Sequence, residues 1–449
     1  MKRFLYQIFR TLSAIQRRMK KRFTVGGAFV LCGLAITASF GLDTSRMMIY
    51  QVFTFLFALM AVSYTYSLFF RAGFSVKRII PRFGTVGVPL RYELVVRNES
   101  AKTQTGLSLL EDLGENIPTY KEFVESLEPN EESRNWFDRY VGYYRWQWII
   151  SRKLRGGVQE RILPYMKPGK TVSIQSEVVP FHRGRLYLTG VTISRKDPFG
   201  LVKTSLTVRE NQAVQVLPKR YPIRAIQFPG TKKYQQGGVA MTSSVGESGD
   251  FVSLRDYRVG DPMRRIHWKS WAKIGKPIVK EYQEEYFVRH ALVLDTFTDS
   301  DFSEVFEAGI SVAASFASSI QTMESLLDLM FVGGKSYCFT AGRALSSMER
   351  ILEILSAVRL CRDKPFHTLR RSVINRISMM SGCICILLSW DEERRDFIDQ
   401  LKRYGIPLLV LVVGDSKMPD PLDLGPMKDK PSALHRLEVG KIEEGLSKI

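Results

Sequence analysis

Two long apolar runs stand near the start of the chain. Residues 23–42 and 47–70 contain no charged side chain, and each is long enough at 1.5 Å per residue to cross roughly 30 Å of hydrocarbon. A four-residue polar connection separates the runs. A second run directly behind the first argues against a cleaved signal peptide. The pattern therefore predicts a two-helix transmembrane hairpin over residues 23–70.

Beyond the hairpin, apolar and polar positions mostly alternate from about residue 74 to residue 217. Residues 90–97 are typical, because they alternate like a half-buried strand and end at an Asn-Glu turn. Several such strands separated by Gly and Pro predict a β-sandwich-like domain over 71–223. One Asp-Pro-Phe-Gly sequence, at 197–200, predicts a tight turn with an aromatic plug. An insertion interrupts the domain at about 112–166.

From residue 290 onward, strand and helix patterns alternate. Strands are expected at 291–296, 329–332, 335–339, 383–389 and 407–413, and helices at 303–327, 346–360 and 392–404. This alternation predicts a doubly wound, mainly parallel α/β domain over 290–414. Residues 224–289 precede it as a linker followed by a charged segment. A Pro- and Lys-rich tail, 415–449, follows it, and the sequence leaves the role of this tail open.

The middle of the insertion, residues 135–152, is unusually aromatic. It holds three tryptophans, three tyrosines and several arginines. Three interpretations remain open: a packed helical lid, a segment at the membrane interface, or a platform on which nucleic-acid bases stack.

Charge sets the expected orientation and partners. The chain has 65 Lys and Arg against 45 Asp and Glu, a net charge of +20, which favours an acidic partner such as anionic lipid. Residues 1–22 are strongly basic, and cations also follow residue 70, so both termini are expected in the cytoplasm of a two-pass bacterial inner-membrane protein. Five cysteines without a Cys-x-x-Cys pair indicate reduced structural thiols.

The segment 246–289 combines a Gly-Asp-Pro turn with a dense run of cations and aromatics. Its order is Gly-Glu-x-x-Asp-Phe-x-x-Leu-Arg-x-Tyr-x-x-Gly-Asp-x-x-Arg-x-Ile-x-Trp-Lys. This order resembles the hallmark of domain-of-unknown-function family 58, a family of bacterial membrane proteins. The resemblance implies a von Willebrand factor A-like domain and, as a partner, a MoxR-type AAA+ ATPase. It implies no agreed activity.

The hallmark segment carries charges of both signs at close spacing. Mutual ion pairing is one interpretation, and a docking surface for an acidic or phosphate-bearing partner is the other. The candidate binding residues are Glu247, Asp250, Arg255, Asp261, Arg264, Arg265, Trp268 and Lys269.

The resemblance also implies a metal-ion-dependent adhesion site at the carboxyl ends of the sheet. Such a site surrounds Mg²⁺ with hard oxygen ligands. The matching positions in this chain are Asp295, Asp299, Thr340 and Asp391. Phe297 stands where the first ligating serine is expected, so the signature is incomplete. We therefore favour protein contact without a cofactor, with Mg²⁺ as the alternative.

Catalytic motifs are missing from the sequence. It has no Walker A run, no His-Glu-x-x-His and no Gly-x-Ser-x-Gly, and its five histidines are scattered. No enzyme and no catalytic residue is predicted. The preferred hypothesis is a membrane-anchored interaction or scaffold protein that recruits a MoxR-type ATPase. A Mg²⁺-dependent adhesion module is the alternative. Nucleic-acid binding is disfavoured because the membrane flanks explain part of the charge, and the oligomeric state stays open.

Overall fold

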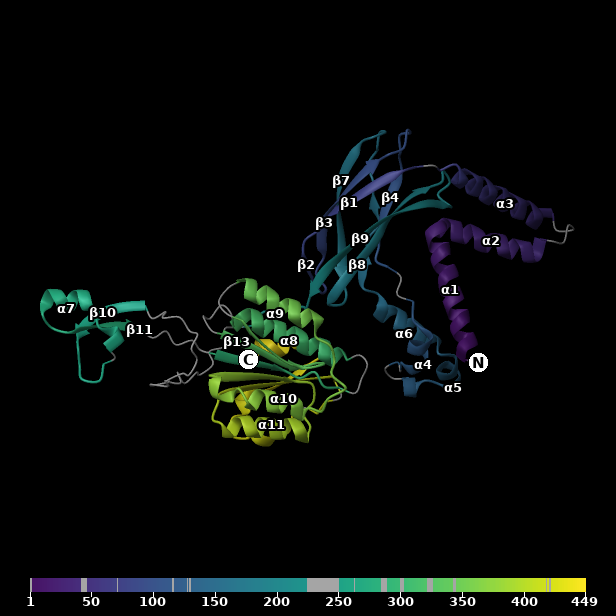
Figure 1. Ribbon diagram of the computed structural model, residues 1–449. Coiled ribbons are helices and arrows are strands. Elements are labelled where there is room, and N and C mark those ends of the chain that lie inside the picture. The colour runs from purple at the N-terminus through teal and green to yellow at the C-terminus, as the bar shows by residue number, and fades with distance from the viewer. Residues whose placement is uncertain are drawn as a thin grey trace. The chain divides into compact units, whose positions relative to one another are not determined.

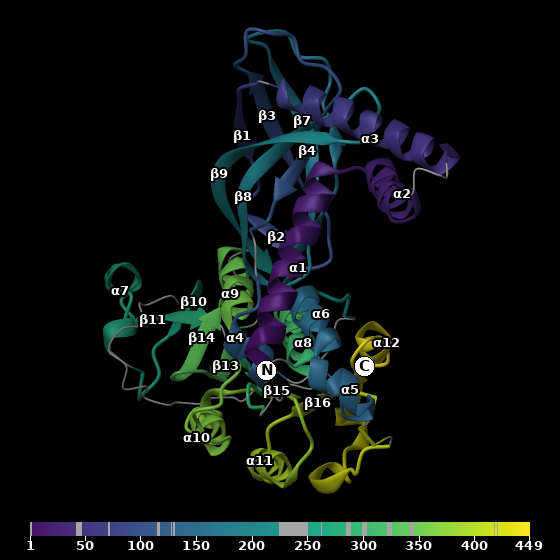
Figure 2. The ribbon, with the colours of Figure 1, turned by 90° about the vertical axis from the view of Figure 1, so that its right-hand side faces the viewer.

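The computed structural model forms two compact units, the first comprising Met1–Lys219 with Leu352–Val358 and the second Arg220–Ile351 with Arg359–Ile449 (Figures 1 and 2). The structure describes residues 2–41, 47–70, 72–114, 117–126, 128, 131–223, 250–261, 263–283, 289–298, 303–320, 326–341, 345–416, 418–419 and 421–449.

Three helices open the first unit: α1 (Lys2–Arg22), α2 (Val25–Gly41) and α3 (Met47–Leu68). Helices α2 and α3 run side by side (Figure 1), and Gly33 of α2 faces the side chain of Leu56 of α3. Among the described helices, only 48–68 is long and apolar enough to cross a membrane, judged by length and composition; 25–39 is apolar but shorter. The two-pass hairpin stays a prediction.

Two sheets follow in the first unit. One has the strand order β1 (Phe74–Ile79), β3 (Leu90–Asn98), β7 (Thr171–Pro180), β5 (Gly156–Val158). The other has the order β2 (Phe83–Thr85), β9 (Lys203–Leu217), β8 (Gly184–Lys196), β4 (Leu107–Asp112), β6 (Arg161–Ile162). Neighbouring strands are antiparallel except for the parallel pair β2 and β9.

The two sheets share one apolar core, and strand β3 shows why. Its burial alternates, so that Tyr92, Leu94 and Val96 point into the core with Leu186 and Leu188 of β8. The alternation predicted for residues 90–97 is confirmed. Successive side chains of a strand point to opposite faces, so every second residue of β3 is buried. A core shared by two sheets is what a β-sandwich requires.

The insertion forms three short helices, α4 (Tyr120–Glu125), α5 (Trp136–Val141) and α6 (Tyr143–Lys153). A buried aromatic cluster joins them to α1, with Phe9 of α1 packed against Phe123 and Trp146. The indole of Trp146 also donates to the hydroxyl of Ser13 over 3.0 Å. This part of the insertion is therefore a packed helical lid on α1, whereas Trp136 is 77% exposed.

The second unit contains a six-stranded sheet. Its order is β14 (Ser336–Ala341), β13 (Leu326–Val332), β12 (Arg289–Leu294), β15 (Gly382–Leu387), β16 (Leu408–Gly414), β17 (Leu434–Glu438). All neighbours are parallel except β13 and β14. The sheet is thus mixed, and its von Willebrand A-like assignment stays a prediction.

Helices cover both faces of this sheet. Helix α8 (Glu304–Ile320) lies on one face, while α10 (His367–Ile374) and α11 (Glu392–Arg403) lie on the other (Figure 1). Helix α9 (Leu345–Ala357) precedes α10, and α12 (Ile442–Ser447) ends the chain. Burial on both faces explains why strands such as β15 read as unbroken apolar runs.

Three elements differ from the sequence expectation. The helix predicted to reach residue 327 ends at Ile320, and Leu326 already begins β13, because a short apolar run fits a helix or a strand equally well. Helix α10 was not predicted. Strand β17 extends the sheet into the segment assigned to the tail.

The hallmark segment folds as a small hairpin within the second unit. Strand β10 (Asp250–Asp256) pairs antiparallel with β11 (Ile278–Gln283), and α7 (Trp268–Ile274) lies between them in the chain. An isolated bridge from Ile266 to Val279 ties the start of α7 to β11.

Candidate functional site

The carboxyl ends of β12 and β15 meet at one edge of the six-stranded sheet. Leu294 is paired with Ile386, and the amide of Asp295 continues the ladder by donating to the carbonyl of Ile386 over 2.9 Å. The loop after β15 leads to Asp391, the N-cap of α11. In open α/β sheets this edge is where ligands bind, so it is the candidate site.

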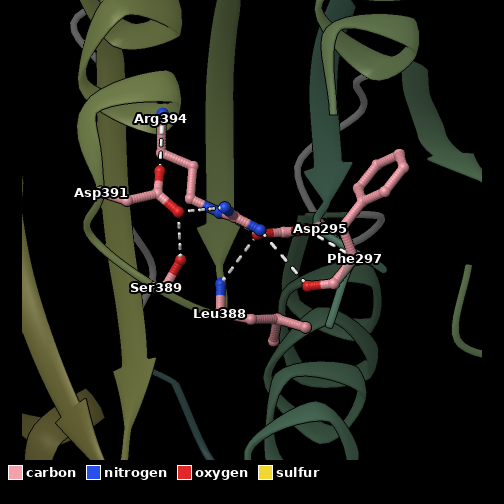
Figure 3. A network of polar contacts seen from close by, with 6 residues as sticks. All are labelled: Asp295, Phe297, Leu388, Ser389, Asp391 and Arg394. Atoms are coloured by element: carbon pink, nitrogen blue, oxygen red, sulfur yellow. Dashed lines mark hydrogen bonds and ion pairs between the residues drawn. The ribbon is translucent and has the colours of Figure 1, made fainter. Parts of the chain in front are cut away.

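Asp295 lies fully buried at the centre of this edge (Figure 3). Its Oδ1 accepts from the amide of Phe297 over 2.9 Å. Its Oδ2 accepts from the amide of Leu388 over 3.1 Å and from Nε of Arg394 over 2.7 Å. Both carboxylate oxygens are therefore engaged by donors from within the fold.

Arg394 supplies the positive charge at this point. Its Nη1 donates to the carboxylate of Asp391 and its Nη2 to the carbonyl of Phe297, while the guanidinium lies 4.7 Å from the centre of the Phe366 ring. Burial disfavours the charged guanidinium, but the carboxylates of Asp295 and Asp391 outweigh it, so the pKa of Arg394 is raised. The site thus contains a fixed internal cation.

Asp391 links this cation to the start of α11. Its Oδ1 accepts from the amide of Arg394 over 3.0 Å, which caps the helix, and its Oδ2 accepts from the hydroxyl of Ser389 over 2.9 Å. One side chain therefore orders the helix, the guanidinium and the loop that follows β15.

The structure does not bring all the predicted metal ligands together. Asp295 and Asp391 meet through Arg394, but Thr340 lies elsewhere and donates to Asp328 over 2.6 Å. In the register, Thr340 pairs with Asp328, which is level with Ala291. Four residues of strand separate that level from Asp295, about 13 Å. The prediction that Thr340 belongs to this site is therefore wrong. Asp299 lies outside the described residues.

The residues present do not fit a Mg²⁺ ion. Magnesium needs a near-octahedral set of oxygen ligands, whereas Arg394 already neutralises Asp295. The ring of Phe297 packs against Phe366, with 5.6 Å between ring centres, and offers no ligand. Within the described part of the chain, no group of three or more His, Cys, Asp or Glu is placed to hold a metal.

A pocket of about 530 Å³ opens over this network, within the range typical of ligand sites. Arg394 and Asp391 lie in its wall. The other lining side chains include cations, anions and apolar groups, among them Thr298, Cys361, Arg362, Lys364, Phe366, Glu393 and Asp415. The pocket is therefore mixed in charge, and Arg394 links Asp391 and Phe297 in its wall.

The hallmark segment places two of its charges together. Arg255 donates from Nη1 and Nη2 to the two carboxylate oxygens of Asp261 over 2.7 and 2.8 Å, and the amide of Arg258 donates to the same carboxylate over 2.8 Å. The Arg255 guanidinium and then the Arg258 amide lower the pKa of Asp261 to about 2. This pair holds the turn between β10 and α7.

Other hallmark cations face solvent. Arg264, Arg265 and Lys269 are exposed, and among the described residues they have no carboxylate partner. Trp268 is 61% exposed and stacks on Trp271, with ring centres 5.1 Å apart. Glu247 lies outside the described residues, and of Asp250 only the main chain is described.

Comparison with known sequences places the hallmark in a family. Residues 253–367 match the family described as "Protein of unknown function DUF58". This region of the chain is similar to that family. The resemblance noted from the hallmark is thereby confirmed. The matched region includes Asp295 and ends before Asp391 and Arg394.

One curated relative of this chain is the "Uncharacterized protein YeaD" of Bacillus subtilis (strain 168). The two are 22% identical over 234 residues, which cover 51% of this chain and 56% of YeaD. The chain thus spans little more than half the length of this relative. Among solved structures, a GH20 exo-β-N-acetylglucosaminidase from Vibrio harveyi matches 79% of this chain and 59% of its own at 8% identity, with a TM-score of 0.14. That value carries no argument about the fold.

Proposed function

We propose that this DUF58 chain is a membrane-anchored interaction protein that recruits a protein partner through its α/β unit. The ion pair between Asp295 and Arg394 is the observation that carries the proposal. In this pair the guanidinium of Arg394, and not a bound metal ion, holds the edge of the sheet in place. A ligand ion is then not needed to shape the surface that a partner contacts.

The internal cation preorganises two loops. Arg394 contacts the carbonyl of Phe297 and the carboxylate of Asp391, so the segments after β12 and β15 are held in one arrangement. Surfaces that are ordered before binding lose less conformational entropy when a partner docks. The polar pocket over Arg394 is therefore suited to recognition.

Charge indicates the chemistry of the partner. The exposed cations Arg264, Arg265 and Lys269 beside Trp268 suit an acidic protein surface, since Arg and Trp are frequent anchors at interfaces. A MoxR-type AAA+ ATPase is the partner class that the family resemblance implies. Helix α3, and α2 beside it, would anchor the complex to the cytoplasmic face of the membrane.

Binding of the full chain in lipid nanodiscs to a MoxR-type ATPase from the same organism tests this function. Reversing two hallmark charges, Arg264→Glu with Arg265→Glu, is expected to weaken binding at least tenfold. The matched control reverses two exposed cations of the same unit, Arg403→Glu with Lys441→Glu, and should bind like the parent.

Two outcomes would contradict the proposal. If both double variants weakened ATPase binding equally, the effect would come from net charge and not from the hallmark cations. Displacement of the ATPase by a short oligonucleotide at low salt would favour nucleic-acid binding, whose affinity falls steeply as salt rises.

A further inference from the structure

The junction between α1 and α2 is clamped onto the turn that joins β8 to β9. The amide of Thr24 donates to the carbonyl of Leu201 over 3.0 Å, and its hydroxyl donates to the carbonyl of Gly200. Phe23 forms an isolated bridge with Val202. The first residues of α2 are thus fixed to the end of the five-stranded sheet.

The turn itself is ordered by one carboxylate. Oδ1 of Asp197 accepts from the amides of Leu201 and Val202, both over 2.7 Å, and Oδ2 accepts from the amide of Phe199 over 3.0 Å. Helix α2 also approaches closely, because a Cβ on Gly27 would lie 2.0 Å from the Leu201 carbonyl oxygen. The tight turn predicted at 197–200 therefore positions a helix.

A pocket of about 730 Å³ lies at this junction. Three lysines line it, Lys20 from α1, Lys196 from β8 and Lys203 from β9. The remaining lining is mostly apolar or small: Gln16, Met19, Phe23, Thr24, Val25, Gly26, Ala28 and Gly200. The lining therefore combines three cations with the apolar first turn of α2.

The charge in this pocket is incompletely balanced. Lys203 donates to the two carboxylate oxygens of Glu160 over 3.0 and 3.1 Å. Lys20 and Lys196 are exposed, and neither makes a hydrogen bond or close ion pair to a described residue. Of the three lysines, only Lys203 therefore has a described carboxylate at hydrogen-bond distance, and the ammonium groups of Lys20 and Lys196 are available to an added anion.

The helices around the pocket suit the boundary between water and lipid. In both views α1 leaves the junction in a direction different from that of α2 (Figures 1 and 2). Helix α1 exposes apolar side chains such as Leu12 and Ile15 among its cations, which is typical of a helix lying in a membrane surface. If α2 enters the bilayer, the three lysines lie at the depth of the phosphate groups.

We propose that this pocket binds an anionic phospholipid, with the headgroup phosphate between Lys20, Lys196 and Lys203 and the acyl chains along α2. The inference rests on the membrane anchoring in the proposed function. Val25 and Phe29 are 76% and 73% exposed on α2 and offer apolar surface to an acyl chain. A free phosphate would use only the three lysines. Lysine side chains at such a boundary extend their charged ends toward headgroups.

Native mass spectrometry of the full chain in detergent tests the pocket, with phosphatidylglycerol and phosphatidylcholine as probes. The parent is expected to bind one phosphatidylglycerol at least tenfold more tightly than phosphatidylcholine. The variant Lys20→Gln with Lys196→Gln should retain less than a twofold preference. The charge-matched control is Arg91→Gln with Arg185→Gln, both exposed; Arg185 lies eleven residues from Lys196 along β8, about 36 Å away. This control should keep the tenfold preference.

Three results would overturn the lipid site: no preference in the parent, a preserved preference in the lysine variant, or equal loss in the control. Displacement of phosphatidylglycerol by glycerol 3-phosphate would instead identify a site for soluble phosphate, which also overturns it. Carbonate extraction of membranes tests the anchor separately. A parent chain released by carbonate refutes the anchor, whereas a retained chain without lipid preference refutes the pocket alone.

Discussion

Nε of Arg394 donates to Oδ2 of Asp295 over 2.7 Å and joins two residues that lie 99 positions apart in the chain. The carboxylate is fully buried and the arginine nearly so. A charge buried in this way is tolerated because its partner is present, and removing Arg394 leaves the Asp295 carboxylate buried without a cation. The edge of the sheet therefore depends on a pair that spans most of the α/β unit.

The variant Arg394→Met is expected to destabilise the α/β unit by about 3–5 kcal/mol, since it leaves the Asp295 carboxylate buried without its cation. Thermal and urea unfolding of the full chain in detergent would measure this. The matched control, Arg403→Met, removes an exposed arginine from the same helix and should cost less than about 1 kcal/mol. Equal losses of unfolding free energy for the two variants would mean that the buried pair contributes no more to stability than an exposed one.

Magnesium or manganese should leave the unfolding temperature unchanged. Because Arg394 occupies the cation position beside Asp295, no binding energy is available to shift the transition. A bound ion at a hundred times its dissociation constant would add about 2.7 kcal/mol, which a melting curve resolves. A shift that appears with metal and disappears in Asp295→Ala would refute this expectation and restore the adhesion-site hypothesis.

The pair of Arg255 and Asp261 gives the hallmark turn a predictable pH response. The folded pKa of Asp261 is lowered to about 2 from an ordinary 3.8, so its stabilising contribution is fully present above about pH 5 and is lost progressively as the pH falls to about 1. In Arg255→Gln the largest cause is gone, and the pKa should rise toward its ordinary value. Carboxylate ¹³C shifts of labelled aspartates would report this, and Arg264→Gln, as the control, should leave the pKa low.

Gly27→Ala should disrupt the junction between α1 and α2, because the added methyl group meets the Leu201 carbonyl oxygen at 2.0 Å. Gly33→Ala lies in the same helix, with its Cβ 3.4 Å from the flexible side chain of Leu56, and should be tolerated. Alanine is otherwise the better helix former by about 1 kcal/mol. A lower unfolding temperature for Gly27→Ala alone is expected; comparable temperatures would show that the clamp is unimportant.

Much of the fold can be predicted from local patterns of apolar and polar residues. Alternation of apolar and polar residues predicts β3, and unbroken apolar runs predict β15 and β16, because burial on one face or on both faces determines which positions are apolar. Strand β17 was hidden, since its short sequence Leu-His-Arg-Leu-Glu follows a Pro- and Lys-rich stretch that resembles a loop. Its neighbour β16 supplies the pairing that the pattern does not show.

The composition of the candidate site is harder to predict from local patterns of the sequence. The family resemblance matches Thr340 to a metal ligand because it follows the strand predicted at 335–339, but β14 runs antiparallel to β13, so its carboxyl end lies toward the opposite edge. Arg394 was missed because an arginine three residues after a helix cap is ordinary in sequence. Only the fold brings it to Asp295, and no local spacing encodes a contact across 99 residues.

The clamp between Thr24 and Gly200 also orders events during synthesis. Its two halves are 176 residues apart, so at about 5–20 residues per second the helices emerge about 9–35 seconds before the turn that holds them exists. The apolar surface of α2 stays exposed even after the clamp has closed, with Val25 76% and Phe29 73% exposed, so lipid is the environment that suits it throughout. Membrane insertion of α2 would then precede folding of the sheets, and the clamp would close only after the turn between β8 and β9 had formed.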